Sequence, residues 1–254
     1  MYSWSLPTLV LVFFLLLLYM AGWRSVHASF PTALSPWRAV VFAAGMMTVG
    51  VALGSPLAML DHYYLTAHMI QHLLTTTIAP PLILLGAPFV IMAHARPRVF
   101  SAVAGRSPLA HPVVCWLAGV AVVIGWHVPA AFALGMKSPA WHTIEQATFL
   151  TAGMLFWWPV IRPWPAVAKW PTWSIPVYLF LATLPCDALS AFLCLCNRVV
   201  YPHYGLYDPM ALKDQACAGA LMWVWVTFAY LFPAAVLTFR LLSPERRFIQ
   251  EQVA

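Results

Sequence analysis

Residues 66–92 read TAHMIQHLLTTTIAPPLILLGAPFVIM and form one long apolar run with two histidines near its start. A helical run of about 20 apolar residues is long enough to cross the hydrocarbon core of a bilayer. His68 and His72 are four residues apart, a little over one helical turn, so both imidazoles project from one face. Histidine is costly inside a membrane and marks a candidate functional site. The run therefore predicts a membrane helix that carries a pair of potential ligands.

Apolar runs of this kind recur along the whole chain, in which 63% of the residues are hydrophobic and only 8% are charged. This composition lies far from that of soluble proteins. The connections between the runs are short, so we expect residues 1–254 to form a single membrane domain. The sequence predicts an all-α bundle of seven transmembrane helices, over residues 6–23, 37–56, 66–92, 112–134, 142–161, 174–195 and 214–241.

The net charge of +6 comes from basic residues that are sorted by loop, a pattern that does not indicate nucleic-acid binding. The loops after the first, third, fifth and seventh runs contain Arg24, Arg38, Arg96, Arg98, Arg106, Arg162, Lys169, Arg240, Arg246 and Arg247. The other loops contain only Lys137, Arg198 and Lys213. Cytoplasmic loops are enriched in Lys and Arg. We therefore expect a multi-pass membrane protein with the N-terminus outside and the C-terminus in the cytoplasm.

With this orientation, polar side chains from several predicted helices fall at a similar depth near the outer face. Ionisable groups inside a membrane normally face the bundle interior, and bundles build metal sites from histidines and carboxylates on facing helices. We expect the metal ligands to be His68, His72, His127 and His142. Further ligands, or residues that hold the ligand imidazoles in place, are expected among Asp61, His62, Glu145, Asp187, Asp214 and Cys217.

Two further features bear on this outer site. Imidazole suits copper, zinc and iron, whereas sulfur ligands favour Cu(I). Met59, Met69 and Met222 lie at a similar depth and are candidate soft ligands, although methionine is also ordinary filler in an apolar bundle. The pair Pro80-Pro81 interrupts the third predicted helix, so we expect a kink there that orients the histidine-bearing half independently of the rest.

Several motifs occur in order along the chain. They are Leu60-Asp61-His62, His68-Met69-Ile70-Gln71-His72, Pro80-Pro81, Gly86-Ala87-Pro88, Trp126-His127-Val128-Pro129, His142-Thr143-Ile144-Glu145, Phe156-Trp157-Trp158-Pro159 and Leu212-Lys213-Asp214-Gln215. Together they resemble the polytopic CtaG family of cytochrome c oxidase assembly factors, over residues 30–240. The sixth run departs from the pattern, because Cys186, Cys194 and Cys196 make it richer in thiols than the family requires.

The resemblance implies a non-enzymatic role in building haem-copper oxidases of the caa type, at the step of copper supply. It implies copper as the bound metal and a bacterial inner membrane as the location. It also implies a haem-copper oxidase subunit or a periplasmic copper chaperone as partner, besides the lipid bilayer. The residues alone indicate only an outer site that is able to bind a metal.

Three other interpretations fit parts of the pattern. His72 and His127, from different helices, are able to ligate a b-type haem in a membrane cytochrome. Asp187 and Asp214 are candidate proton carriers of a proton-coupled transporter, although the chain lacks the internal repeat that many transporters show. The spacing of His68 and His72 matches the zinc-protease helix, but that motif needs glutamate directly after the first histidine, where this chain has Met69.

Overall fold

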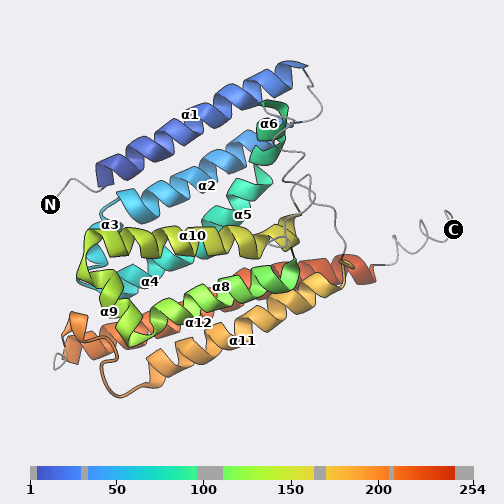
Figure 1. Ribbon diagram of the computed structural model, residues 1–254. Helices are drawn as coiled ribbons and strands as arrows, with labels where there is room; N and C mark the ends of the chain where they lie inside the picture. The colour runs from blue at the N-terminus through green and yellow to red at the C-terminus, as the bar shows by residue number, and fades with distance from the viewer. Residues whose placement is uncertain (1–4, 30–33, 96–110, 163–169, 206–208, 244–254) are drawn as a thin grey trace.

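The computed structural model describes residues 5–29, 34–95, 111–162, 170–205 and 209–243. Within these ranges the chain forms helices and no strand, which confirms the all-α prediction. The elements are α1 (Ser5–Ser29), α2 (Pro36–Gly54), α3 (Leu57–Leu60), α4 (Leu65–Leu73), the π-helix η1 (Leu74–Ile78), α5 (Ala79–Leu85), α6 (Pro88–Ala95), α8 (Pro112–His127), α9 (Pro129–Lys137), α10 (Pro139–Ile161), α11 (Ser174–Leu195), the 3-10 helix η3 (Pro202–Tyr204) and α12 (Pro209–Leu242). Figure 1 shows the long helices side by side, with α10 between the α1–α2 edge and the α11–α12 edge.

Prolines determine where many of these helices begin. The helices α2, α8, α10 and α12 start at Pro36, Pro112, Pro139 and Pro209. The first helical position tolerates proline because its backbone N–H has no intrahelical partner and its φ angle suits the helix. The same rule divides two of the predicted runs, since α6 begins at Pro88 and α9 begins at Pro129 within them.

The helix lengths and composition support a membrane protein. Four described helices are long and apolar enough to cross a membrane, and the number rises to six if each bent pair is one span. These pairs are Leu65–Leu85 with Pro88–Ala95, bent by 51°, and Pro112–His127 with Pro129–Lys137, bent by 78°. The predicted run 142–161 lies in α10, which has 23 residues but is not among these candidates. The count of seven spans and the orientation stay predictions.

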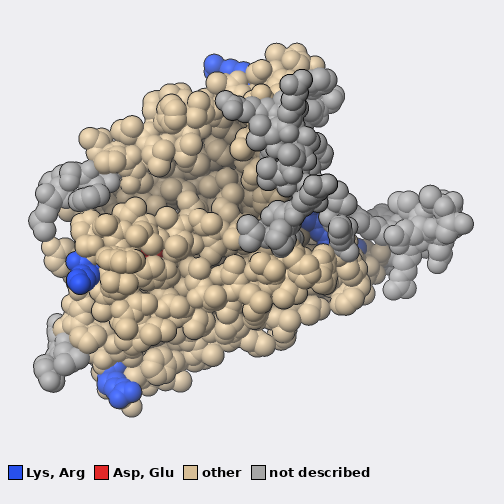
Figure 2. Space-filling view, viewed as in Figure 1, with Lys and Arg blue, Asp and Glu red and all other residues tan. Residues whose placement is uncertain are grey.

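The surface agrees with the helix composition. On the face seen in Figure 2, Lys and Arg side chains sit at the margins, and the surface between them is almost wholly uncharged. A polar belt across the middle of such a face would be expensive in contact with hydrocarbon. The distribution therefore suits a molecule whose long sides are in contact with lipid.

Two apolar cores hold the bundle together. The smaller joins α1, α2 and α6, and in it the rings of Tyr19 and Phe42 stack at 3.7 Å. The larger joins α4 and α5 to α8–α12. Within it α11 and α12 approach closely at Gly219, where a Cβ atom would lie 2.6 Å from the backbone nitrogen of Cys194. Small residues allow such backbone contact between membrane helices.

The third predicted helix contains the π-helical turn η1 just before its proline pair. Pro80 has no N–H, so a carbonyl one turn earlier lacks its intrahelical donor. The indole of Trp157 on α10 donates to that Thr76 carbonyl at 3.0 Å. Helix α10 comes this close at Gly153, where a Cβ atom would lie 2.8 Å from the same Thr76 oxygen. A side chain from a neighbouring helix thus satisfies the backbone group that proline leaves without a donor.

The bend of 51° lies after this turn, at Gly86-Ala87, and not at Pro80-Pro81 where a kink is expected from the sequence. Ala87 adopts a left-handed conformation with φ of 53°. Pro88 follows it and disfavours the right-handed helical conformation at the preceding residue. The Tyr19 hydroxyl donates to the Gly86 carbonyl at 2.7 Å, so α1 holds the bend in place.

We expect Trp157→Phe to lower the free energy of unfolding by about 1–3 kcal/mol, because the buried Thr76 carbonyl loses its donor. Thermal unfolding in detergent measures the change. Trp158→Phe is the matched control, since the Trp158 indole N–H has no hydrogen-bond partner among the described residues. Equal loss of Tm in both variants would show that the bond to Thr76 is not what stabilises η1.

Candidate metal centre

Helix α4 carries both histidines of the quoted run, and its first turn is held by a residue from α12. The Asp214 carboxylate accepts hydrogen bonds from the backbone N–H of Leu65 at 2.5 Å and of Thr66 at 3.3 Å. The Thr66 hydroxyl donates in return to the Asp214 carbonyl at 3.1 Å. A carboxylate at a helix N-terminus satisfies free N–H groups and favours the helix dipole. Asp214 is therefore an N-terminal cap supplied by a distant helix, and it sets where α4 begins.

Three donor atoms from α4 and α10 converge one turn further along. The Nε2 atoms of His68 and His72 are 2.7 Å apart. Oε1 of Glu145 lies 3.5 Å from the first and 3.4 Å from the second. All three side chains are buried. Tetrahedral ligands that hold a metal at about 2.0–2.1 Å lie roughly 3.3 Å apart, so the two separations from Glu145 suit a bound ion. The 2.7 Å between the imidazoles is a hydrogen-bond distance, and it would lengthen when both rings bind one ion.

A second group adjoins the first and shares His68 with it. Asp61, His68 and His142 bring ligand atoms within 4.8 Å of one another. The His142 ring lies between the two carboxylates, with Nε2 2.9 Å from Oδ2 of Asp61 and Nδ1 3.3 Å from Oε2 of Glu145. We call Asp61, His68, His72, His142 and Glu145 the histidine–carboxylate cluster.

The carboxylates of this cluster lie within ion-pair distance of imidazoles, at 2.9 Å for Asp61 and His142 and 3.3–3.5 Å for Glu145. Both side-chain oxygens of Asp61 and both of Glu145 are buried, and among the described residues none of them accepts a well-aligned hydrogen bond. Burying an ionised carboxylate without compensation is costly. A protonated imidazole at these distances, or a metal cation at the point where the oxygens and imidazole nitrogens converge, would supply that compensation.

Glycine makes room for the central carboxylate. Helix α9 passes over α10 at Gly135, where a Cβ atom would lie 2.6 Å from Oε2 of Glu145 and 3.1 Å from its Cδ. The bend of 78° between α8 and α9 turns Gly135 toward α10. The ring of Phe149 stacks on His72 at 3.8 Å and restricts the imidazole from the other side.

Burial decreases from the cluster toward the α3–α9 end of the bundle. The side chains of His68 and Glu145 are 0% and 1% exposed, that of His142 is 17% exposed, and that of His62 is 51% exposed. Nε2 of His62 lies 3.9 Å from Oδ1 of Asp61. Solvent therefore meets the cluster on the side of His142, with His62 beside the entrance.

An aromatic residue from η3 secures this entrance. The Tyr204 hydroxyl donates to the backbone carbonyl of Asp61 at 2.7 Å. Burial raises the pKa of the Tyr204 phenol well above its ordinary value, and the charge of Asp61 acts in the same direction. The phenol is therefore a permanent hydrogen-bond donor near neutral pH.

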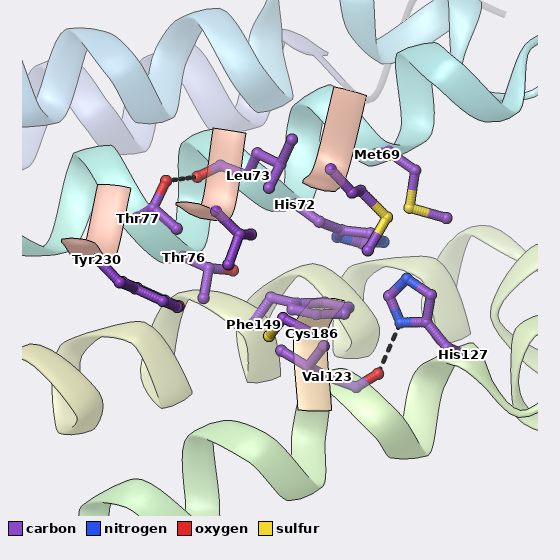
Figure 3. A pocket seen from close by; sticks show the side chains of 12 residues that line it. Met69, His72, Leu73, Thr76, Thr77, Val123, His127, Phe149, Cys186 and Tyr230 are labelled. Carbon is purple, nitrogen blue, oxygen red and sulfur yellow. Dashed lines mark hydrogen bonds between the residues drawn. The ribbon is translucent and has the colours of Figure 1, made fainter. Parts of the chain in front are cut away.

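His127 is buried but stands outside the cluster. Its Nδ1 lies 2.6 Å from the carbonyl of Val123, one turn earlier on α8. Its Nε2 has no hydrogen-bond partner among the described residues. The ring lines a cavity beside the cluster, together with His72 (Figure 3).

The remaining candidates lie elsewhere. Asp214 acts as the cap of α4. Cys217 is exposed one turn further along α12. Asp187 is partly buried on α11 and belongs to neither group of metal-competent side chains found in the described ranges. The structure thus brings together His68, His72, His142, Glu145 and Asp61, with His62 at the entrance.

Sequence reasoning missed two glutamines that position the cluster. The Gln146 amide donates to Oε1 of Gln71 at 3.1 Å, and the Gln71 amide donates to the Ala52 carbonyl at 3.0 Å. This chain of bonds connects α10, α4 and α2 directly beside the histidines. Gln71 lies between His68 and His72 in the sequence, and Gln146 directly follows Glu145. This adjacency to candidate ligands could have indicated that both glutamines lie beside the cluster.

A family model described as cytochrome c oxidase caa3 assembly factor, CtaG, matches residues 17–243. No curated protein and no solved structure matches. The helical bundle and its buried polar cluster define a membrane protein with a metal-competent interior. The chain belongs to the caa3 cytochrome c oxidase assembly factor family, as its motifs predict.

We expect Asp214→Ala to destabilise α4, at a cost of about 0.5–2 kcal/mol for loss of an N-terminal cap. Deuterium exchange at the amides of Leu65 and Thr66 should increase, because their shared acceptor is removed. Asp214→Asn retains one acceptor oxygen and should recover part of the protection. Cys217→Ala, an exposed change on the same helix, is the control and should leave the exchange unaltered.

Proposed function

We propose that this chain binds copper at the histidine–carboxylate cluster and hands it over during assembly of a caa3-type cytochrome c oxidase. The family membership supplies the assembly role. The observation that carries the metal assignment is the convergence of His68, His72 and Glu145 within 2.7–3.5 Å of one another in a buried site. Copper is here the cargo of the protein.

The donor set suits this proposal. Imidazole nitrogen is a good ligand for copper, and carboxylate oxygen adds negative charge that favours a divalent ion. Asp61 and Glu145 together carry enough charge to balance Cu²⁺ once the imidazoles are neutral. An assembly factor also needs a cargo that is able to leave, and the exposed His62 and half-buried His142 form a graded path between the cluster and solvent.

We propose further that this path opens on the extracytoplasmic side of a bacterial inner membrane, in a bundle of seven spans. The distribution of Lys and Arg supports that orientation. The entrance at His62 would then face a periplasmic copper chaperone or the outer part of an oxidase subunit. Release of the ion would proceed past the His142 side chain, which is 17% exposed, toward that of His62, which is 51% exposed.

The structure gives less support to the other interpretations. A haem bound by His72 and His127 would have to occupy the cavity that both residues line, and this cavity has a volume of about 30 Å³. Such a volume suits an ion or one or two water molecules. For a transporter, Asp214 is engaged in capping α4 and Asp187 lies outside the cluster.

Metal analysis of the protein purified in detergent and loaded with Cu²⁺ tests the proposal. We expect bound copper in the wild type without a Soret band, and loss of that copper in His68→Ala/His72→Ala. The matched control is His94→Ala/His111→Ala, which removes two exposed histidines from the opposite end of the helices. Copper retained by the cluster variant, or a Soret band with matching iron in the wild type, would contradict the proposal.

We expect Gly135→Ala to weaken Cu²⁺ binding about 10- to 100-fold, the range found when groups that orient metal ligands are disturbed. The added methyl group would lie 2.6 Å from the Glu145 carboxylate and must displace it. Gly125→Ala, on the neighbouring helix α8, is the control because nothing lies within 4 Å of its Cβ position. Competition titrations measure both affinities, and equal affinities would remove Glu145 from the set of ligands.

A further inference from the structure

A cavity of about 30 Å³ lies beside the cluster, between α4, α8, α10, α11 and α12. Several of the side chains that line it carry a nitrogen or sulfur atom able to bind a metal, and none of them is a carboxylate. They are Met69, His72, His127, Cys186 and Met222. His72 belongs to both places, because it is a member of the cluster and its ring also forms part of the cavity wall.

His127 presents a lone pair to this space. Its Nδ1 bonds to the carbonyl of Val123 at 2.6 Å, and a carbonyl only accepts, so Nδ1 carries the proton. Nε2 is then unprotonated in the neutral ring and has no hydrogen-bond partner among the described residues. Figure 3 shows the ring of His127 turned toward the part of the cavity that Met69 occupies. A backbone bond to one ring nitrogen, which leaves the other free, is the usual preparation of a histidine ligand.

The sulfur atoms are as deeply buried as the imidazole. Met69, Met222 and Cys186 are 1%, 4% and 6% exposed, and they come from three different helices. Each alone would be ordinary apolar filler. Two thioethers, one thiol and one free imidazole nitrogen around a volume of ionic size form a specific set of donors, and soft sulfur ligands select Cu(I).

The cavity and the cluster differ in the charge of their side chains. The cluster contains the carboxylates of Asp61 and Glu145, which suit a divalent ion. The side chains that line the cavity include no carboxylate. Because the cost of burying an ion without counter-charge is steep, neutral donors suit a monovalent ion better than a divalent one.

We infer that the cavity is a second metal site, built for a soft monovalent cation such as Cu(I), with Met69, Met222 and His127 as its ligands and Cys186 within its wall. Binding there rests on the residues of the cavity alone. That the ion belongs to the copper cargo of the protein rests on the function proposed above, and Cu(I) would enter the cavity as Cu(I), with no change of oxidation state between the two sites. The protein would then hold its cargo in two adjacent places that differ in the charge and softness of their ligands.

Titration of the full chain in detergent with Cu⁺ under reducing conditions, against a chromophoric chelator, tests the inference. We expect Met69→Leu/Met222→Leu to weaken Cu⁺ binding by at least about tenfold. The control Met46→Leu/Met154→Leu removes two thioethers that do not line the cavity and should bind as the wild type does. Unchanged Cu⁺ affinity in the cavity variant would overturn the inference.

A second pair of measurements separates this site from the cluster. Asp61→Asn/Glu145→Gln should weaken Cu²⁺ binding and leave Cu⁺ binding within about twofold of the wild type, because these residues do not line the cavity. Loss of Cu⁺ in that variant would place the ion in the cluster and overturn the inference. Cu⁺ binding that survives while the wild type takes up no Cu²⁺ would support the cavity and contradict the proposed function of the cluster.

X-ray absorption of the wild type loaded with Cu⁺ covers the case in which a variant fails to fold. Copper with sulfur neighbours and one imidazole is the expected result. Copper with nitrogen and oxygen neighbours only would contradict a site made from Met69 and Met222.

Discussion

Polar groups carried by α4 and η1 must find their partners inside the bundle, since neither an apolar core nor a lipid surface supplies water. Most of them do so through neighbouring helices. Asp214 on α12 caps the first turn, Gln71 bonds to α2 and α10, and Trp157 on α10 donates to the Thr76 carbonyl that Pro80 deprives of a donor. The hydroxyls of Thr75 and Thr77 donate hydrogen bonds to backbone carbonyls one turn earlier in the same helical segment.

The groups left without such partners are concentrated at the histidines. Free imidazole nitrogens and all four carboxylate oxygens of Asp61 and Glu145 lie within the cluster, and the free nitrogen of His127 lies beside it. These nitrogen and oxygen atoms are therefore available as ligands. Close contacts around the cluster, including Gly135 against Glu145 and Phe149 against His72, hold its donor atoms near one another, at 2.7–3.5 Å for His68, His72 and Glu145.

The sequence predicted the helical class, the family and the pairing of His68 with His72, because these follow from composition, motif order and a spacing of four residues. It also predicted that His142 and Glu145 share a face, and both reach the cluster. Its expectations for Asp187, Asp214 and Cys217 rested on depth alone. Each helix is about 10 Å wide, so residues at the same depth can lie on opposite sides of the bundle. Depth therefore does not decide which of these side chains come into contact.

What the sequence by itself determined is local: where helices start at prolines, which residues face the same side of one helix, and that the chain is an apolar helical protein. The tertiary structure alone decided which helices face one another. In the tertiary structure Asp214 caps α4 and not its own helix α12, and the bend lies at Gly86-Ala87. His127 lines a separate cavity together with Met69. The physical reason is that helix rotation and close approach depend on contacts such as Gly153 against Thr76 and Gly219 against Cys194, which join residues far apart in the chain.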